Sequence, residues 1–370
     1  MNRFYFVILL LLIVNTELHA SVGFHQSVLI SPGERTLSVT MWYPIQLESG
    51  LKPVGENAAF YGVDVITDAP PGPEKHPLVL LSHGYGGSWR NLSWLAAALV
   101  AQGYIVAAPD HPGTTALNKN PAEASRLWLR PHDLTRVLNY LLANATLVGK
   151  IDDKRIAATG HSLGGWTVMA LAGAKFSPTQ FRRECKKTSS VTVCNLQKKL
   201  GLNTPDADRH FAAALADPRI KSVIALDAGL VRGFTQASLS HITIPVLLLA
   251  AGNNIADLPA HDESGYLAKY LPPSLVKFNI IPDASHFSFM QLCKPNAAQL
   301  IDKDAPGEGI ICRDATQRSR ATLHQEIQHQ IIDFLAVSLN YCPIKSQGSL
   351  VDKHGGILQD SSQLSVKIRD

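Results

Sequence analysis

A glycine-flanked serine between a strand-forming run and a helix-forming run limits the fold of this chain more than any other feature. The motif is Gly160-His161-Ser162-Leu163-Gly164, which matches the pattern G-x-S-x-G. The residues before it, 155–159, favour a strand, and residues 166–174 favour a helix. In this context the serine occupies a strained turn that exposes its Oγ atom. We therefore predict that Ser162 is a nucleophile, with an ordinary helix N-cap serine as the alternative.

Strand-forming and helix-forming segments alternate along most of the chain. This order is typical of a mostly parallel, wound sheet with helices on both faces, and with the serine motif it predicts the α/β-hydrolase fold. Two strand-like runs at 26–30 and 36–43 flank Ser31-Pro32-Gly33 and predict an antiparallel hairpin at the start. Residues 46–76 are rich in proline and glycine and are expected to form loops. The other expected strands are 78–82, 104–108, 155–159, 222–226, 246–251 and 276–281, and the expected helices are 89–102, 123–145, one after Ser162, and 316–338.

The first twenty residues are typical of a secretory signal peptide. They combine Arg3, an apolar run at 4–14 and the segment Leu18-His19-Ala20. A retained membrane anchor would need a longer apolar run. We therefore expect cleavage near Ala20 and an exported protein, periplasmic or secreted.

The remaining chain is expected to form one α/β-hydrolase domain at 21–343, followed by a polar, disordered tail at 344–370. Within the domain, residues 175–217 fit no strand-helix unit and predict an insertion over the sheet. Apolar residues make up 46% of the chain and charged residues 17%, which is enough for a large core. The net charge of +4 is not gathered into a long basic tract, so nucleic acid is not expected as a partner. The sequence carries no signal for the oligomeric state.

All five cysteines lie after the expected cleavage site, where an oxidising compartment permits disulfides. Proximity along the chain predicts the pairs Cys185–Cys194 and Cys293–Cys312 and leaves Cys342 unpaired. The alternative is that some of them are free buried thiols. No C-x-x-C pair or histidine-rich spacing is present, so no metal site is expected.

Two further segments lie at strand ends where a nucleophilic serine needs partners. The loop His83-Gly84-Tyr85-Gly86-Gly87 follows strand 78–82, and its glycines let backbone amides approach a substrate oxygen. We assign the two oxyanion donors to the amides of Tyr85 and Leu163.

His286 follows strand 276–281, and its late position matches the order serine, acid, histidine, so it is the candidate general base.

Two aspartates qualify as the acid that orients this histidine. Asp227 follows strand 222–226 at once, which gives it a defined position. Asp257 lies several residues into the loop after strand 246–251. We favour Asp227 and keep Asp257 as the alternative.

Several segments of the chain together resemble the plasma-type platelet-activating-factor acetylhydrolases and the bacterial dienelactone-hydrolase-like esterases. The resemblance covers about 36–339. It rests on Met41-Trp42-Tyr43-Pro44, Leu81-Ser82-His83-Gly84, the segments 103–111 and 160–165, Ala225-Leu226-Asp227-Ala228 and Ser285-His286-Phe287.

The resemblance implies an acid in a Leu-Asp-Ala segment, which favours Asp227. Asn254 points the same way, because it stands about where many other hydrolases carry their acid. It also implies attack on esters without a metal or cofactor, with short or oxidised acyl groups preferred. The insertion at 175–217 is longer than in the plasma enzymes and is expected near the site.

These residues predict a serine hydrolase that cleaves carboxylic esters through a Ser-His-Asp triad and an acyl-enzyme intermediate. The expected substrate is a small-molecule or lipid ester, and the resemblance implies short-acyl lipid or phospholipid esters. The alternatives are an amidase or peptidase on the same triad, or a catalytically silent binding protein. Apolar Trp89, Trp94 and residues 127–129 would either form a lipid-facing entrance, giving transient contact with a membrane surface, or pack inside the protein.

Overall fold

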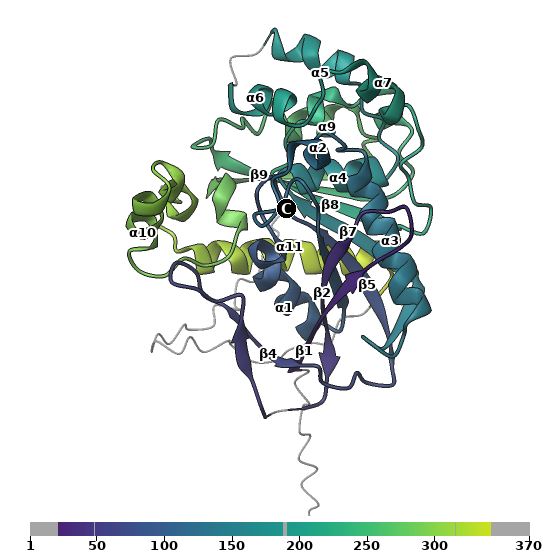
Figure 1. Ribbon diagram of the computed structural model, residues 1–370, viewed down its shortest axis with the longest axis vertical. Coiled ribbons are helices and arrows are strands. Elements are labelled where there is room, and N and C mark those ends of the chain that lie inside the picture. The colour runs from purple at the N-terminus through teal and green to yellow at the C-terminus, as the bar shows by residue number, and fades with distance from the viewer. Residues whose placement is uncertain (1–20, 48, 188–190, 315, 342–370) are drawn as a thin grey trace, which may run out of the picture.

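The computed structural model describes residues 21–47, 49–187, 191–314 and 316–341, and Figure 1 shows their arrangement. A ten-stranded sheet runs through them in the order β10-β9-β8-β7-β5-β6-β2-β1-β4-β3. The neighbours from β10 to β6 are all parallel, and β2 pairs with β6 in the antiparallel sense. The strands are β1 Ser21–Leu29, β2 Leu37–Ile45, β3 Lys52–Val54, β4 Val63–Thr67, β5 Lys75–Ser82, β6 Ile105–Asp110, β7 Lys150–His161, β8 Ser222–Leu226, β9 Val246–Asn253 and β10 Val276–Ser285.

The antiparallel hairpin at the start of the domain is confirmed. Strands β1 and β2 pair in unbroken register from Ser21 opposite Ile45 to Leu29 opposite Leu37. The expectation that 46–76 is all loop is wrong in part, because β3 and β4 lie there and β4 pairs with the edge of β1. These strands are short, and only Val65 of β4 is fully buried, so their apolar pattern is weak.

The two faces of the parallel strands feed two separate cores. Alternate residues of β5 point to opposite sides, so Leu78 and Leu80 join one core while Val79 and Leu81 join the other. Helices α3 and α4 cover the first face, and α1 and α11 cover the second. The predicted wound sheet with helices on both faces is therefore confirmed. The α-helices are α1 Ser93–Ala101, α2 Pro121–Ala124, α3 Leu129–Ala143, α4 Leu163–Leu171, α5 Pro178–Cys185, α6 Val191–Lys199, α7 Pro205–Phe211, α8 Gln236–Ser240, α9 Ser264–Tyr270, α10 Ala297–Asp304 and α11 Arg320–Ser338.

Two predicted helices are broken. The segment 89–102 begins as a 3-10 turn, η1 Trp89–Leu92, before α1. The segment 123–145 divides into α2 and α3. Pro131 explains the second break, since a proline clashes with the carbonyl four residues earlier and cannot continue a helix through it. It is tolerated in the first turn of α3, where its missing N–H is not needed.

The insertion at 175–217 contains α5, α6 and α7, which Figure 1 shows grouped at one end of the molecule. Both predicted disulfides are present. Cys185–Cys194 joins α5 to α6, and Cys293–Cys312 joins the loop after η3 His286–Phe289 to η4 Glu308–Cys312. The structure therefore supports the pairing that sequence proximity predicted.

The predicted signal peptide, the tail and Cys342 lie outside the described residues. Within the part that the structure describes, no helix is both long enough and apolar enough to cross a membrane. Export and the domain limits stay predictions.

Candidate active site

Ser162 lies on the sharp turn between β7 and α4. Its backbone has φ 57° and ψ −118°, and its amide donates to Leu226 O over 2.9 Å. The flanking glycines leave no room for a side chain. A Cβ on Gly160 would lie 2.2 Å from Gly164 O, and one on Gly164 would lie 1.9 Å from Ser82 O. The G-x-S-x-G spacing thus holds the strand, the helix and β5 in direct backbone contact around the serine.

His286 and Asp227 are hydrogen-bonded to each other. His286 begins η3 at the end of β10, and Asp227 directly follows β8. The Nδ1–Oδ2 distance is 2.6 Å, and Asp227 Oδ1 accepts the amide of Ala251 over 2.9 Å. Because a carboxylate accepts, the proton on this face of the ring belongs to Nδ1, which leaves Nε2 as the basic nitrogen.

Asp257 lies elsewhere. Its Oδ2 accepts the amide of Thr192 from α6 over 3.0 Å, so this carboxylate contacts the insertion. Of the two aspartates that the sequence left open, the structure brings Asp227 to His286.

One cavity of about 850 Å³ brings together Ser162, His286 and Tyr85. No hydrogen bond between the Ser162 hydroxyl and the His286 ring is found in the described structure. Nucleophile–base contacts of this kind often tighten only when substrate is bound. The cavity wall mixes apolar and charged groups: Phe60, Leu117, Phe287, Met290, Ile311, Glu56, Arg90, Lys119, Lys199 and Glu308.

The glycine loop after β5 approaches the serine closely. A Cβ on Gly84 would lie 3.1 Å from Ser162 Cβ. The loop is held by Gly86 N, which donates to Thr114 O over 2.8 Å. Neither the Tyr85 amide nor the Leu163 amide donates to an acceptor in the described part of the chain. Both predicted oxyanion donors are therefore available to a ligand.

His161, inside the motif, contacts the candidate base His286, which the sequence did not predict. Its Nε2–H donates to His286 O over 2.9 Å, and the two ring centroids are 4.5 Å apart. Burial lowers the pKa of His161 well below its ordinary value, and the neighbouring His286 lowers it further. A neutral His161 thus fixes the backbone that carries His286.

The apolar residues considered for a lipid-facing entrance mostly pack inside. Trp89 and Leu127 are buried, and Trp94 stacks on His324 with 3.6 Å between ring centroids. None of these residues lines the cavity with Ser162. Within the described residues, no group of three or more histidine, cysteine or acidic side chains could hold a metal ion.

Comparisons with known proteins agree with this fold. Cutinase 1 of Thermobifida cellulosilytica is 29% identical over 99 residues, which are 26% of this chain and 34% of the cutinase. Bis(hydroxyethyl) terephthalate hydrolase of Streptomyces coelicolor is 27% identical over 120 residues, which are 32% of this chain and 34% of the relative. The chain thus matches about a third of the length of these curated relatives.

Two further comparisons cover more of the chain. The solved structure of a ferulic acid esterase from Streptomyces cinnamoneus shares the fold, with a TM-score of 0.57 and 20% identity over 91% of this chain and 95% of that one. A family model described as "Alpha/beta hydrolase family" matches residues 78–292, more than half of the chain. This chain therefore belongs to the alpha/beta hydrolase family.

Proposed function

We propose that the protein hydrolyses carboxylic esters with Ser162 as nucleophile, His286 as general base and Asp227 as the orienting acid. The hydrogen bond between His286 Nδ1 and Asp227 Oδ2, beside the cavity that Ser162 lines, carries this proposal. It fixes the ring so that Nε2 is the basic nitrogen, and the carboxylate stabilises the imidazolium that forms during the reaction.

The proposed reaction has two steps. Ser162 Oγ attacks the ester carbonyl while His286 Nε2 takes its proton, and the amides of Tyr85 and Leu163 bind the resulting oxyanion. His286 then protonates the leaving alcohol, which yields an acyl-enzyme. Water, activated by the same histidine, releases the acid and restores Ser162.

Three observations support the proposal: the names of the relatives favour an ester over an amide, the cavity bears on the kind of substrate, and the disulfides bear on export. The relatives are named cutinase and bis(hydroxyethyl) terephthalate hydrolase, and the neighbouring structure is a ferulic acid esterase. The cavity is wide and partly apolar, which suits a small-molecule or lipid ester. The two disulfides suit an oxidising compartment. The resemblance to platelet-activating-factor acetylhydrolases adds short-acyl lipid esters as the class to test first.

A fluorophosphonate probe tests the nucleophile. We expect covalent labelling of Ser162 in the folded protein, and loss of both label and esterase activity in Ser162→Ala. Ser240→Ala, at an exposed serine on α8, is the control and is expected to label and turn over like the wild type. Folded wild-type protein that takes no label would overturn the proposal.

A substrate panel tests the bond that is cleaved. p-Nitrophenyl esters of graded acyl length are compared with the matching anilides, which differ only in the atom that leaves. We expect turnover of the esters and little of the anilides. Faster cleavage of the anilides would indicate an amidase on the same triad.

A further inference from the structure

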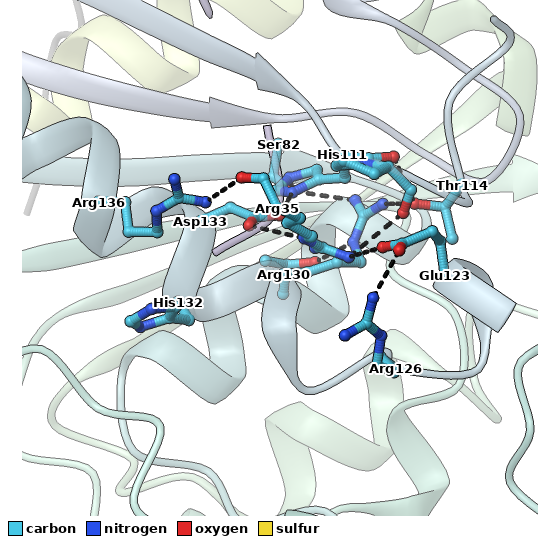
Figure 2. A network of polar contacts seen from close by, with 12 residues as sticks. Arg35, Ser82, His111, Thr114, Glu123, Arg126, Arg130, His132, Asp133 and Arg136 are labelled. Carbon is cyan, nitrogen blue, oxygen red and sulfur yellow. Dashed lines mark hydrogen bonds and ion pairs between the residues drawn. The ribbon is translucent and has the colours of Figure 1, made fainter. Parts of the chain in front are cut away.

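A buried guanidinium lies behind the serine turn and the glycine loop. Arg130, on α3, is 1% exposed, and Figure 2 shows it among Ser82, His111 and Thr114. Its nitrogen atoms donate to the hydroxyls of Ser82 over 3.0 Å, of Thr114 over 2.6 Å and of Thr167 over 2.8 Å, and also to His83 O. One side chain therefore joins three separate segments, at 82–83, 114 and 167, to α3.

Arg130 holds the glycine loop that carries the Tyr85 amide. It binds the carbonyl of His83 directly, and it binds Thr114, whose own carbonyl accepts Gly86 N over 2.8 Å. The loop is thus held on both sides of Tyr85.

The His83 ring holds the peptide that carries the Tyr85 N–H. Its Nε2 accepts the amide of His111 over 2.9 Å, so the ring proton is on Nδ1, which donates to Gly84 O over 2.7 Å. Gly84 C=O and Tyr85 N–H belong to one planar peptide. A bond to the carbonyl therefore fixes the direction of the amide.

The same guanidinium reaches the helix that supplies the second donor. Arg130 Nε donates to Thr167 Oγ1, and Thr167 Oγ1 donates to Leu163 O over 2.9 Å. Leu163 is the first residue of α4, and its amide is the other proposed oxyanion donor. Arg130 is thus linked by hydrogen bonds to both segments that would bind the oxyanion.

The charge of Arg130 is costly where it lies, which argues for a specific role. Burial lowers its pKa to about 9, so it stays charged at neutral pH, and Asp133 opposes the shift. The negative charge of Asp133 is shared between Arg130 and other groups. Asp133 also binds Arg35, and it accepts a hydrogen bond from His111 Nδ1–H over 2.8 Å. A buried charge of this kind adds little stability over apolar packing, but its several donors in a fixed plane fix geometry.

We propose that Arg130 is a positioning residue that sets the distance and direction of the Tyr85 and Leu163 amides toward the oxyanion. The inference rests on the proposed function and deepens it. It places Arg130 outside the reacting atoms, acting through His83, Thr114 and Thr167. Because the amides bind charge that develops only in the transition state, loss of Arg130 lowers kcat rather than raising KM.

Arg130→Lys tests this, because lysine keeps the charge but cannot reach the same set of acceptors. We expect kcat for a p-nitrophenyl ester to fall by at least about tenfold, toward the roughly 100-fold that losing one oxyanion donor causes, with KM within about twofold. The affinity for phenylboronic acid, whose tetrahedral adduct mimics the oxyanion, should fall by the same factor as kcat. Fluorophosphonate should still label Ser162.

Arg136→Lys is the matched control. Arg136 lies on the same helix and is similarly buried, but it binds Arg35 O and Glu34 rather than the glycine loop. We expect it to lower the unfolding temperature without changing kcat or boronate affinity. Should Arg130→Lys fail to fold, Thr167→Val removes the hydroxyl that joins Arg130 Nε to Leu163 O and leaves the bonds of Arg130 to Ser82, His83 and Thr114 in place. At least a threefold loss of kcat is then expected (about 0.7 kcal/mol).

The two possible failures are distinct. Two results for folded Arg130→Lys would contradict the positioning role: an unchanged kcat, or a loss of kcat/KM that comes entirely from a higher KM. In either case wild-type turnover would still support the proposed function. If Arg130→Lys does not fold, an unchanged kcat in Thr167→Val contradicts it instead. Wild-type protein that neither hydrolyses esters nor takes the label would overturn the proposed function and this inference together.

Discussion

Ser162 and Asp227 leave the sheet side by side, and both have a backbone φ in the left-handed region, 57° and 42°. Their proximity follows from strand register, because His161 of β7 pairs with Leu226 of β8 and each is the last residue of its strand. Non-glycine residues adopt such angles at a cost of about 1–3 kcal/mol. This strain is found at the carboxyl ends of β7 and β8, at the two residues that we propose as nucleophile and acid.

The two candidate aspartates have different contacts, Asp227 with His286 and Asp257 with Thr192, and one substitution at each tests which is the acid. Asp227→Asn keeps the size of the side chain but lets its amide donate to His286, which favours the wrong ring tautomer. We expect kcat to fall by about 10⁴-fold, whereas Asp257→Asn should stay within about twofold of the wild type. Ester turnover of the two purified variants measures this. The reverse order would make Asp257 the acid.

The sequence could single out Ser162 and His286 as candidates because strand ends and the order serine, acid, histidine limit where such residues can lie. Arg130 could not be found in the same way. A single arginine on a helix usually reads as a solvated charge, and its acceptors at 82–83, 114 and 167 come together only through the fold. His161 was missed for a similar reason, since its contact with His286 joins the end of β7 to the start of η3, which are far apart in the sequence.

Among the elements, the parallel strands were predictable and the peripheral ones were not. Buried strands such as β5 are continuous apolar runs, whereas β3 and β4 are short and only partly buried. The helices of the insertion depend on contacts with distant segments. Phe181 of α5 and Phe211 near Trp166 fill the space above α4. The sequence alone does not contain these contacts, and the three helices were not predicted individually.

The disulfide between α5 and α6 is expected to stabilise the folded protein. Replacing Cys185 and Cys194 together by serine removes a cross-link between residues nine apart. We expect the free energy of unfolding to fall by about 2 to 3 kcal/mol, because the unfolded chain regains the entropy of the open loop. Chemical denaturation of both proteins under non-reducing conditions measures it.

The same variant tests whether α6 shapes the cavity. Lys199, the last residue of α6, lines the cavity that Ser162 also lines. Loosening α6 should therefore change KM for bulky esters more than kcat. The pair Cys293→Ser with Cys312→Ser, at the second disulfide, is the comparison. Equal unfolding free energies for the wild type and the α5–α6 variant would contradict the stabilising role.

For the molecule as a whole, burial keeps four histidines neutral. Burial lowers the pKa of His83, His111 and His161 well below the ordinary value, and lowers that of His324 to about 3. Three buried carboxyls shift the other way because burial disfavours their charge: the pKa of Asp133 is raised, that of Asp110 is raised to about 6 and that of Glu263 to about 7. Acid therefore acts on stability through opposing contributions.

A substitution at His324 separates one of these contributions to acid stability from the others. Its Nε2–H donates to Ser288 O and Met290 O, its ring stacks on Trp94, and Arg320 and Asp314 are the charged groups that act on it. The folded pKa is below the ordinary 6.5, so its neutral form contributes stability that is present above pH 6.5 and is lost as pH falls toward 3. Over that range the unfolded chain binds a proton that the folded protein does not.

The His324→Gln variant should therefore depend less steeply on acid than the wild type. From about pH 7.5 to about pH 5, the wild type should lose about 2 kcal/mol more unfolding free energy than the variant does. Asp110, Glu263 and the other buried histidines are present in both proteins, so their contributions cancel in the difference between the two pH slopes. Urea denaturation at both pH values supplies the four free energies. Parallel slopes would mean that His324 gains its proton in the folded state, which its contacts with two carbonyls through one N–H and its stacked ring argue against.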